Sequence, residues 1–306
     1  MQEDYKKILT YPSKIAKTKK GNIEYALYGE GPVLLFIHGG PGGYDQGLIL
    51  GEFFRIHGYK ILSVSRPGYL MTPLESGRTI EEQADLYALL MDYLEIEKTG
   101  VIHTSAGGPS GYTFTGKYSN RVMAQIAIDS VSMNYSPKIS HIEKVIFLNK
   151  YGMWIMNFIS NYFPKMALKE LLKTESTLNK EEIERRADEI IKNHMNLQIF
   201  KALISSTGGT RYNERKKGVH NDLALFKMID KIDMTGITCP TLIIHGDSDK
   251  DVSPPHAEYA QKAIKGSKIY WMPRGSHLSF FISEAGKSAR DESINFFKDH
   301  IIHDNI

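Results

Sequence analysis

The sequence predicts an α/β protein with a mostly parallel sheet, flanking helices and an inserted helical lid. Short β-rich runs alternate with longer helical stretches from residue 21 to about 130, a pattern typical of a parallel sheet. The alternation stops between about 131 and 235, where the sequence is helical, and then resumes. We therefore expect residues 1–130 and 236–306 to form one core, and residues 131–235 to form a lid, or cap.

The bulk composition is that of a globular protein and excludes several classes of partner. The chain has 306 residues, of which 42% are hydrophobic and 24% are charged. A net charge of +3 is too small to predict a nucleic-acid partner. The single cysteine, Cys239, suits a reducing compartment. Neither an apolar signal-peptide core nor a run long enough to span a bilayer is present, so we expect a soluble, cytoplasmic protein without a membrane partner.

Local sequence patterns predict the individual strands and helices. A helix is predicted from Thr79 to Leu94, because apolar residues recur at three- and four-residue spacing and Thr79 with Glu82 forms a capping box. Asn179 is the expected cap of a lid helix. The expected strands are Asn22–Tyr28, Val33–Ile37, Lys60–Val64, Gly100–Ile102, Ala124–Ile128, Thr241–Ile244 and Lys268–Met272. Further helices are expected at Pro109–Tyr118, near His256–Ile264 and after Ser283.

Ser105 has the setting of a nucleophile. It lies between the strand Gly100–Ile102 and the helix Pro109–Tyr118, within the segment His-Thr-Ser-Ala-Gly. A tight strand-to-helix turn lifts such a hydroxyl above the sheet, where a histidine can reach it and backbone amides can face the reacting carbonyl. The departure from a small-x-nucleophile-x-small turn is His103, whose ring either finds room among its neighbours or distorts the turn.

A glycine-rich loop from His38 to Gly43 follows the strand Val33–Ile37. Its glycines allow backbone N–H groups to approach an oxyanion closely. We expect the N–H groups of Gly40 and Ala106 to form an oxyanion hole. His38 is expected to brace the loop through hydrogen bonds and to transfer no proton.

An acid and a histidine follow the last two predicted strands. Asp249 comes after the strand that ends at Ile244, and His277 comes after the strand that ends at Met272. The chain order Ser, Asp, His is that of the α/β-hydrolase arrangement, with His277 as general base and Asp249 as the acid that orients it. The competing acids for this role are Asp247, Asp251 and Asp129.

These segments together resemble the α/β-hydrolase family over roughly residues 21–300. The resemblance implies an eight-stranded, mostly parallel sheet with a helical cap between the sixth and seventh strands, and no cofactor. The glycine loop is similar to that of proline iminopeptidases, although Ala106 and Ser65-Arg-Pro-Gly68 differ from the segments typical of those enzymes. Ser105 differs from the aspartate that haloalkane dehalogenases and epoxide hydrolases carry at the turn.

Two other segments resemble known binding motifs but lack a required residue. Residues 111–118 nearly spell a phosphate-binding loop, but Tyr118 replaces the magnesium-binding Ser or Thr, and a helix is predicted there. The acidic residues from Asp247 to Glu258 have calcium-loop spacing, but Val252 stands where glycine is required. We therefore expect neither a nucleotide nor a metal.

The leading hypothesis is a serine hydrolase that cleaves small or medium carboxylic esters through an acyl-enzyme. One alternative is an aminopeptidase for an N-terminal proline, which needs a lid acid to hold the substrate ammonium; Glu170, Glu175 and Glu181 are the candidates. Another is a small-molecule-binding protein that has lost turnover. The lid residues Met153, Trp154, Met156, Phe158, Tyr162, Phe163 and Met166 are expected to be core, with a minority lining an apolar substrate pocket.

Overall fold

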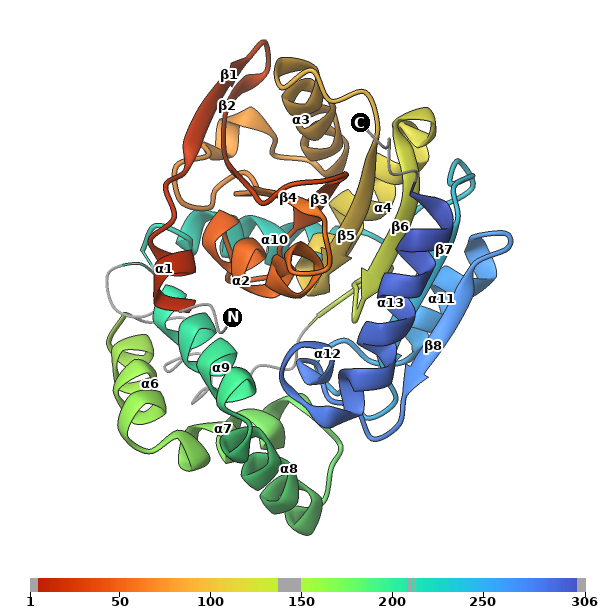
Figure 1. Cartoon of the computed structure of the whole chain (residues 1–306). Helices are drawn as coiled ribbons and strands as arrows, with labels where there is room; N and C mark the ends of the chain where they lie inside the picture. The colour runs from red at the N-terminus through yellow and green to blue at the C-terminus, as the bar shows by residue number, and fades with distance from the viewer. Residues whose placement is uncertain (1–4, 137–149, 208–210, 212, 302–306) are drawn as a thin grey trace.

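The computed structural model describes residues 5–136, 150–207, 211 and 213–301. In this part of the chain, eight strands form one sheet in the order β1-β2-β4-β3-β5-β6-β7-β8 (Figure 1). The strands are β1 (Lys14–Thr18), β2 (Gly21–Tyr28), β3 (Val33–Ile37), β4 (Lys60–Val64), β5 (Thr99–Thr104), β6 (Val122–Ile128), β7 (Thr241–Gly246) and β8 (Lys268–Met272). All neighbours from β4 to β8 are parallel, and β1 and β2 are antiparallel to theirs. The predicted mostly parallel sheet is confirmed.

The central strands are buried on both faces, as their continuous apolar sequences predict. In β3, Leu34 and Phe36 belong to one core, and Leu35 and Ile37 belong to the other. This alternation follows from the two-residue period of a strand. The first core includes residues of α2 (Tyr44–Arg55) and α13 (Lys287–His300). The second includes residues of α3 (Ile80–Tyr93), α4 (Gly108–Lys117) and α11 (Pro255–Ala263).

The local signals for helix starts are confirmed. Thr79 and Glu82 form a capping box before α3, and Asn179 and Glu182 form another before α8. The strand β1 has no counterpart among the predicted strands. Of its five residues only Ala16 is buried, because β1 lies at the edge of the sheet, and its lysines interrupt any apolar alternation.

The described residues between β6 and β7 are mainly helical. We call these helices the α6–α10 segment: α6 (Lys150–Tyr162), α7 (Pro164–Glu175), α8 (Lys180–Lys192), α9 (His194–Thr207) and α10 (Lys216–Met228). Helices α6 to α9 gather beyond the arrowheads of β6 and β8 (Figure 1). Residues 137–149 of the predicted lid lie outside the described residues. None of the described helices is long and apolar enough to cross a membrane.

The aromatic side chains of α6 correct the expectation that they form core. Trp154, Phe158 and Tyr162 are 60%, 47% and 69% exposed, and Phe163 and Met166 are exposed too. Residues four apart share one face of a helix, and this face of α6 points away from α7 and α9, against which the helix packs. Met156, on another face, is buried. The side chain of Met153 lies outside the described residues.

Candidate active site

Ser105 lies on a sharp turn between β5 and α4. Its φ of +52° is in the left-handed region, which non-glycine residues rarely occupy. Neighbouring backbone packs closely around the turn, because a Cβ on Gly107 would lie 2.6 Å from the carbonyl oxygens of Ile37 and His38. A Cβ on Gly108 would lie 2.2 Å from the carbonyl oxygen of Val131. Small residues after Ser105 are therefore required where β3, β5 and β6 end.

The ring of His103 is accommodated without displacing Ser105. A Cβ on Gly111 would lie 2.5 Å from this ring, so the absence of a side chain at Gly111 supplies the space. His103 Nδ1 lies 2.9 Å from Ser130 Oγ, and Tyr112 packs edge-on against the ring. Burial lowers the pKa of His103 to about 3, so the imidazole is neutral. Of the two alternatives for His103, the structure shows the first: its neighbours make room for the ring.

The structure brings Ser105, His277 and Asp249 together. His277 Nε2 lies 3.0 Å from Ser105 Oγ, and His277 Nδ1 lies 2.7 Å from Asp249 Oδ2. Because a carboxylate accepts, Nδ1 carries the proton of the neutral imidazole, and in this neutral form Nε2 can accept the serine proton. The other oxygen of Asp249 accepts the N–H groups of Asp251 and Val252, at 2.9 and 3.0 Å. These bonds fix the carboxylate that orients the imidazole.

A second carboxylate, Asp251, faces the other side of the same imidazole. Its Oδ2 lies 3.5 Å from His277 Nε2, and its Oδ1 accepts the hydroxyl of Tyr135 at 2.5 Å. Burial lowers the pKa of His277, but Asp249 and Asp251 raise it, and the pKa ends well above its usual value. Asp249 therefore occupies the orienting position, whereas Asp251 influences the proton affinity of the imidazole.

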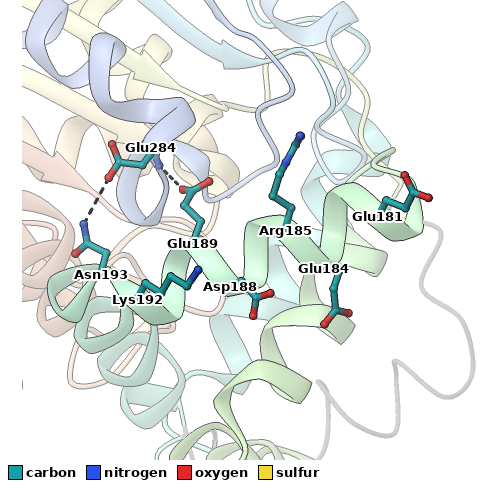
Figure 2. Close-up of a pocket in the computed structure, with 8 residues that line it drawn as sticks. All are labelled: Glu181, Glu184, Arg185, Asp188, Glu189, Lys192, Asn193 and Glu284. Atoms are coloured by element: carbon teal, nitrogen blue, oxygen red, sulfur yellow. Dashed lines mark hydrogen bonds between the residues drawn. The ribbon is translucent and has the colours of Figure 1, made fainter.

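Glu175, one of the three candidate lid acids, interacts electrostatically with His277. It ends α7, and burial first, then Asp251 and Asp249, raise its pKa to about 8 against the opposing effect of His277. Its carbonyl oxygen accepts the N–H of Lys250 at 3.0 Å, which ties the end of α7 to the loop of Asp249. Glu181 instead lines a surface pocket along α8 (Figure 2). Glu170 lines another pocket, beside Lys173.

The glycine loop lies against the serine. A Cβ on Gly39 would lie 2.8 Å from Ser105 Cβ, and one on Gly40 would lie 3.6 Å from the Cβ of Ala106. Gly40 and Ala106, the two predicted donors, thus come from adjacent segments beside Ser105. The close approach of Gly39 was not predicted, although its place in a Gly-Gly pair after a strand is a signal for it.

His38 is buried and held on both ring nitrogens. Its Nδ1–H donates to the carbonyl oxygen of Gly39 at 2.5 Å, and its Nε2 accepts the N–H of Arg66 at 3.0 Å. Burial and the charge of Arg66 keep its pKa well below the usual value. The ring therefore braces the loop as a neutral group.

Asp129, His245 and Asp249 place potential metal-ligand atoms within 4.8 Å of one another. Most of these atoms already form hydrogen bonds within the protein. His245 Nε2–H donates to the carbonyl oxygen of Val252, and Asp129 Oδ1 accepts the N–H of Gly246. Burial and the neighbouring Asp249 raise the pKa of Asp129 well above its usual value, which opposes the deprotonation that a metal ligand needs. Asp129 Oδ2 is buried without a hydrogen-bond partner, but the occupied atoms around it and the raised pKa of Asp129 disfavour a metal ion here.

Comparison with known proteins agrees with this architecture. Residues 32–284 match the family model of the alpha/beta hydrolase fold. The Bacillus subtilis (strain 168) hydrolase YcgS is 29% identical over 276 residues, which cover 88% of this chain and 92% of YcgS. A solved alpha/beta hydrolase fold protein from Nakamurella multipartita is 31% identical, with a TM-score of 0.86 over 93% of this chain and 98% of that one. The chain belongs to the alpha/beta hydrolase fold family, and its relatives support a hydrolase.

A more distant solved structure shares the fold alone. A thermophilic esterase from Thermogutta terrifontis is 20% identical, with a TM-score of 0.62 over 94% of this chain and 99% of that one. The esterase activity is that of the Thermogutta terrifontis protein.

Proposed function

We propose that the protein is a serine hydrolase that cleaves small or medium carboxylic esters through an acyl-enzyme intermediate. The observation that carries the proposal is the continuous hydrogen-bonded chain from Asp249 through His277 to Ser105, with distances of 2.7 and 3.0 Å. Such a chain activates a hydroxyl that is otherwise a weak nucleophile. The family match supports hydrolysis, and a serine nucleophile implies that the reaction passes through an acyl-enzyme.

In the proposed mechanism, Ser105 Oγ bonds to the ester carbonyl carbon while its proton moves to His277 Nε2. The carbonyl oxygen becomes an oxyanion, which the N–H groups of Gly40 and Ala106 face. The tetrahedral intermediate collapses, the C–O bond to the alcohol breaks, and His277 returns its proton to the departing oxygen. A water molecule then repeats the sequence on the acyl-enzyme and releases the carboxylic acid. Asp249 stabilises the imidazolium that forms in each half-reaction.

A fluorophosphonate probe tests the nucleophile directly. The wild-type protein is expected to form a covalent adduct, and Ser105→Ala should abolish it. Ser119→Ala, just beyond the far end of α4, should retain labelling. A panel of p-nitrophenyl esters from acetate to octanoate then identifies the preferred acyl length. Absence of Ser105-dependent labelling together with absence of ester hydrolysis would contradict the proposal.

A second candidate is the aminopeptidase, and the position of Glu175 favours it. Glu175 ends α7, and its carbonyl oxygen accepts the N–H of Lys250, so an acid of the lid lies beside the loop of Asp249. A bound ammonium group would favour the carboxylate form of this acid. Release of naphthylamine from a prolyl derivative, lost selectively in Glu175→Gln while p-nitrophenyl acetate is still cleaved, would favour this candidate. Equal rates in Glu175→Gln and the wild type would exclude a role for Glu175 in amine recognition.

The third alternative, a binding protein without turnover, depended on His103 distorting the turn. His103 fits the space beside Gly111, and the Ser105–His277 hydrogen bond is present. No observation now favours that alternative.

A further inference from the structure

The helix α10 is joined to the core by a buried ion pair. Asp222 accepts two hydrogen bonds from the Arg66 guanidinium, at 2.8 and 2.6 Å, and a third from the hydroxyl of Tyr69, at 2.5 Å. The side chains of Arg66 and Asp222 are only 2% and 7% exposed. Arg66 lies in the Ser-Arg-Pro-Gly segment after β4, and Asp222 lies 156 residues later in the chain.

The same arginine also holds the glycine loop. Its Nε–H donates to the carbonyl oxygen of His38 at 2.9 Å, and its backbone N–H donates to His38 Nε2 at 3.0 Å. Tyr69 completes the contact, because a Cβ on Gly40 would lie 3.3 Å from its hydroxyl oxygen. Asp222 thereby fixes two side chains that touch the loop carrying the proposed oxyanion donor.

A second buried ion pair holds the other end of the loop. Arg215, directly before α10, donates from Nε to the carbonyl oxygen of Gly42 at 3.0 Å and from Nη2 to Asp45 at 2.5 Å. The backbone between these two ion pairs is also in close contact, since a Cβ on Gly218 would lie 2.2 Å from the ring of Tyr69. The start of α10 is therefore packed against both ends of the loop.

The glycine loop needs such external support. Glycine loses more conformational freedom on folding than any other residue, and the loop's glycines offer no side chains by which neighbours can hold them. An oxyanion hole, however, acts only when its donors are already aimed at the developing charge. Buried ion pairs are an expensive route to stability alone, because desolvation offsets their attraction. Their value here lies in fixing a geometry.

We propose that α10 is a working part of the oxyanion site, and that Asp222, through Arg66 and Tyr69, is a positioning residue for the backbone of Gly40. This inference rests on the proposed acyl-transfer function. It assigns a role in transition-state stabilisation to a helix that lies in the predicted lid.

The test compares Asp222→Asn and Tyr69→Phe with the wild type on a p-nitrophenyl ester. Asp222→Asn keeps the shape of the side chain and removes its charge, and we expect kcat to fall about 10- to 100-fold with KM little changed. Tyr69→Phe removes one hydroxyl, and a smaller fall of about three- to tenfold is expected. The affinity for a phenylboronic acid, which forms a tetrahedral adduct on serine, should fall in parallel with kcat.

Glu182→Gln is the matched control. Glu182 on α8 pairs with Arg274 and so also joins the α6–α10 segment to the core, but this pair does not touch the glycine loop. Gln preserves the capping box before α8. We expect its kcat and boronic-acid affinity to stay at wild-type values, and thermal unfolding of each variant separates positioning from loss of fold.

Two outcomes would overturn the inference: kcat in Tyr69→Phe no lower than in Glu182→Gln, or an effect of Asp222→Asn on KM alone. Tyr69→Phe decides the question if Asp222→Asn does not fold. Ser105-dependent labelling of the wild type distinguishes these results from failure of the proposed function, which would abolish labelling in every variant.

Discussion

The α6–α10 segment contains ion pairs of two kinds. At α10, Arg215 pairs with Asp45 and Asp222 pairs with Arg66 of the core, and all four side chains are almost completely buried. Lys165 and Lys169 of α7 instead pair with Glu184 and Asp188 of α8 at the surface, so these pairs join two helices of the segment to each other. On α6, Trp154 and its aromatic neighbours remain exposed.

This difference teaches that helices of one connecting segment need not share one role. A buried ion pair is costly to break, because the partner left behind is an uncompensated charge in a poor solvent for ions. An exposed pair is weakened by water and salt, and its loss is largely compensated by solvation. The ion pairs of α10 therefore bind the helix to the core, whereas the exposed pairs join α7 only to α8.

The largest expected effect is that of Arg215→Met. This change leaves the carboxylate of Asp45, whose side chain is 3% exposed, without its closest cation, and we expect a loss of about 3–5 kcal/mol of unfolding free energy. Lys165→Met, on the exposed pairs, is expected to unfold near the wild-type urea midpoint. Equal midpoints in the two variants would remove the contrast between α10 and α7.

A substitution in the core beside Ser105 should have the next largest effect. A methyl group in Gly111→Ala would lie 2.5 Å from the His103 ring, and overpacking of this kind costs about 1–3 kcal/mol. His103→Ala removes the ring, so the double variant should recover stability and fluorophosphonate labelling relative to Gly111→Ala alone. Additive losses in the double variant, measured by urea unfolding, would show that His103 does not occupy the space at Gly111.

The acid limb of the pH–rate profile should depend on Asp251. His277 accepts the serine proton only when neutral, so kcat/KM rises as the pH passes its raised pKa. The Asp251 carboxylate, 3.5 Å from Nε2, favours the imidazolium. Asp251→Asn removes that charge and should move the limb to lower pH. Asp247→Asn, an exposed neighbour in the same loop, should leave the limb in place; an identical shift in both variants would assign it to the loop's general charge.

The sequence predicted that Ser105, Asp249 and His277 lie close together, because each of them has a local signal. Ser105, Asp249 and His277 each follow a predicted strand, and the carboxyl ends of parallel strands meet at one edge of a sheet. The relation between Arg66 and Asp222 has no such signal. Many arginines and aspartates are possible partners in this chain, and only the packed position of α10 selects this pair.

The aromatic residues of α6 illustrate a different limit of the sequence. Four-residue spacing predicts that Trp154, Phe158 and Tyr162 share a face, but spacing does not say what covers that face. Similarly, the sequence alone suggests that a histidine two residues before Ser105 crowds the turn, whereas in the structure Gly111 lies opposite its ring and leaves room for it. Both facts depend on tertiary contacts between elements that are not adjacent in the chain.

The smallest expected effect is on α6, where Trp154→Ser combined with Phe158→Ser removes two stacked but exposed rings. Exposed apolar side chains contribute little to folding, so we expect each change to alter the unfolding free energy by no more than about 0.5 kcal/mol. Met156→Ala is the matched control, because this neighbour is only 6% exposed and its truncation should cost about 2–5 kcal/mol. If the two ring substitutions destabilise the protein as much as Met156→Ala, the aromatic face is covered in solution, and α6 is held as firmly as α10.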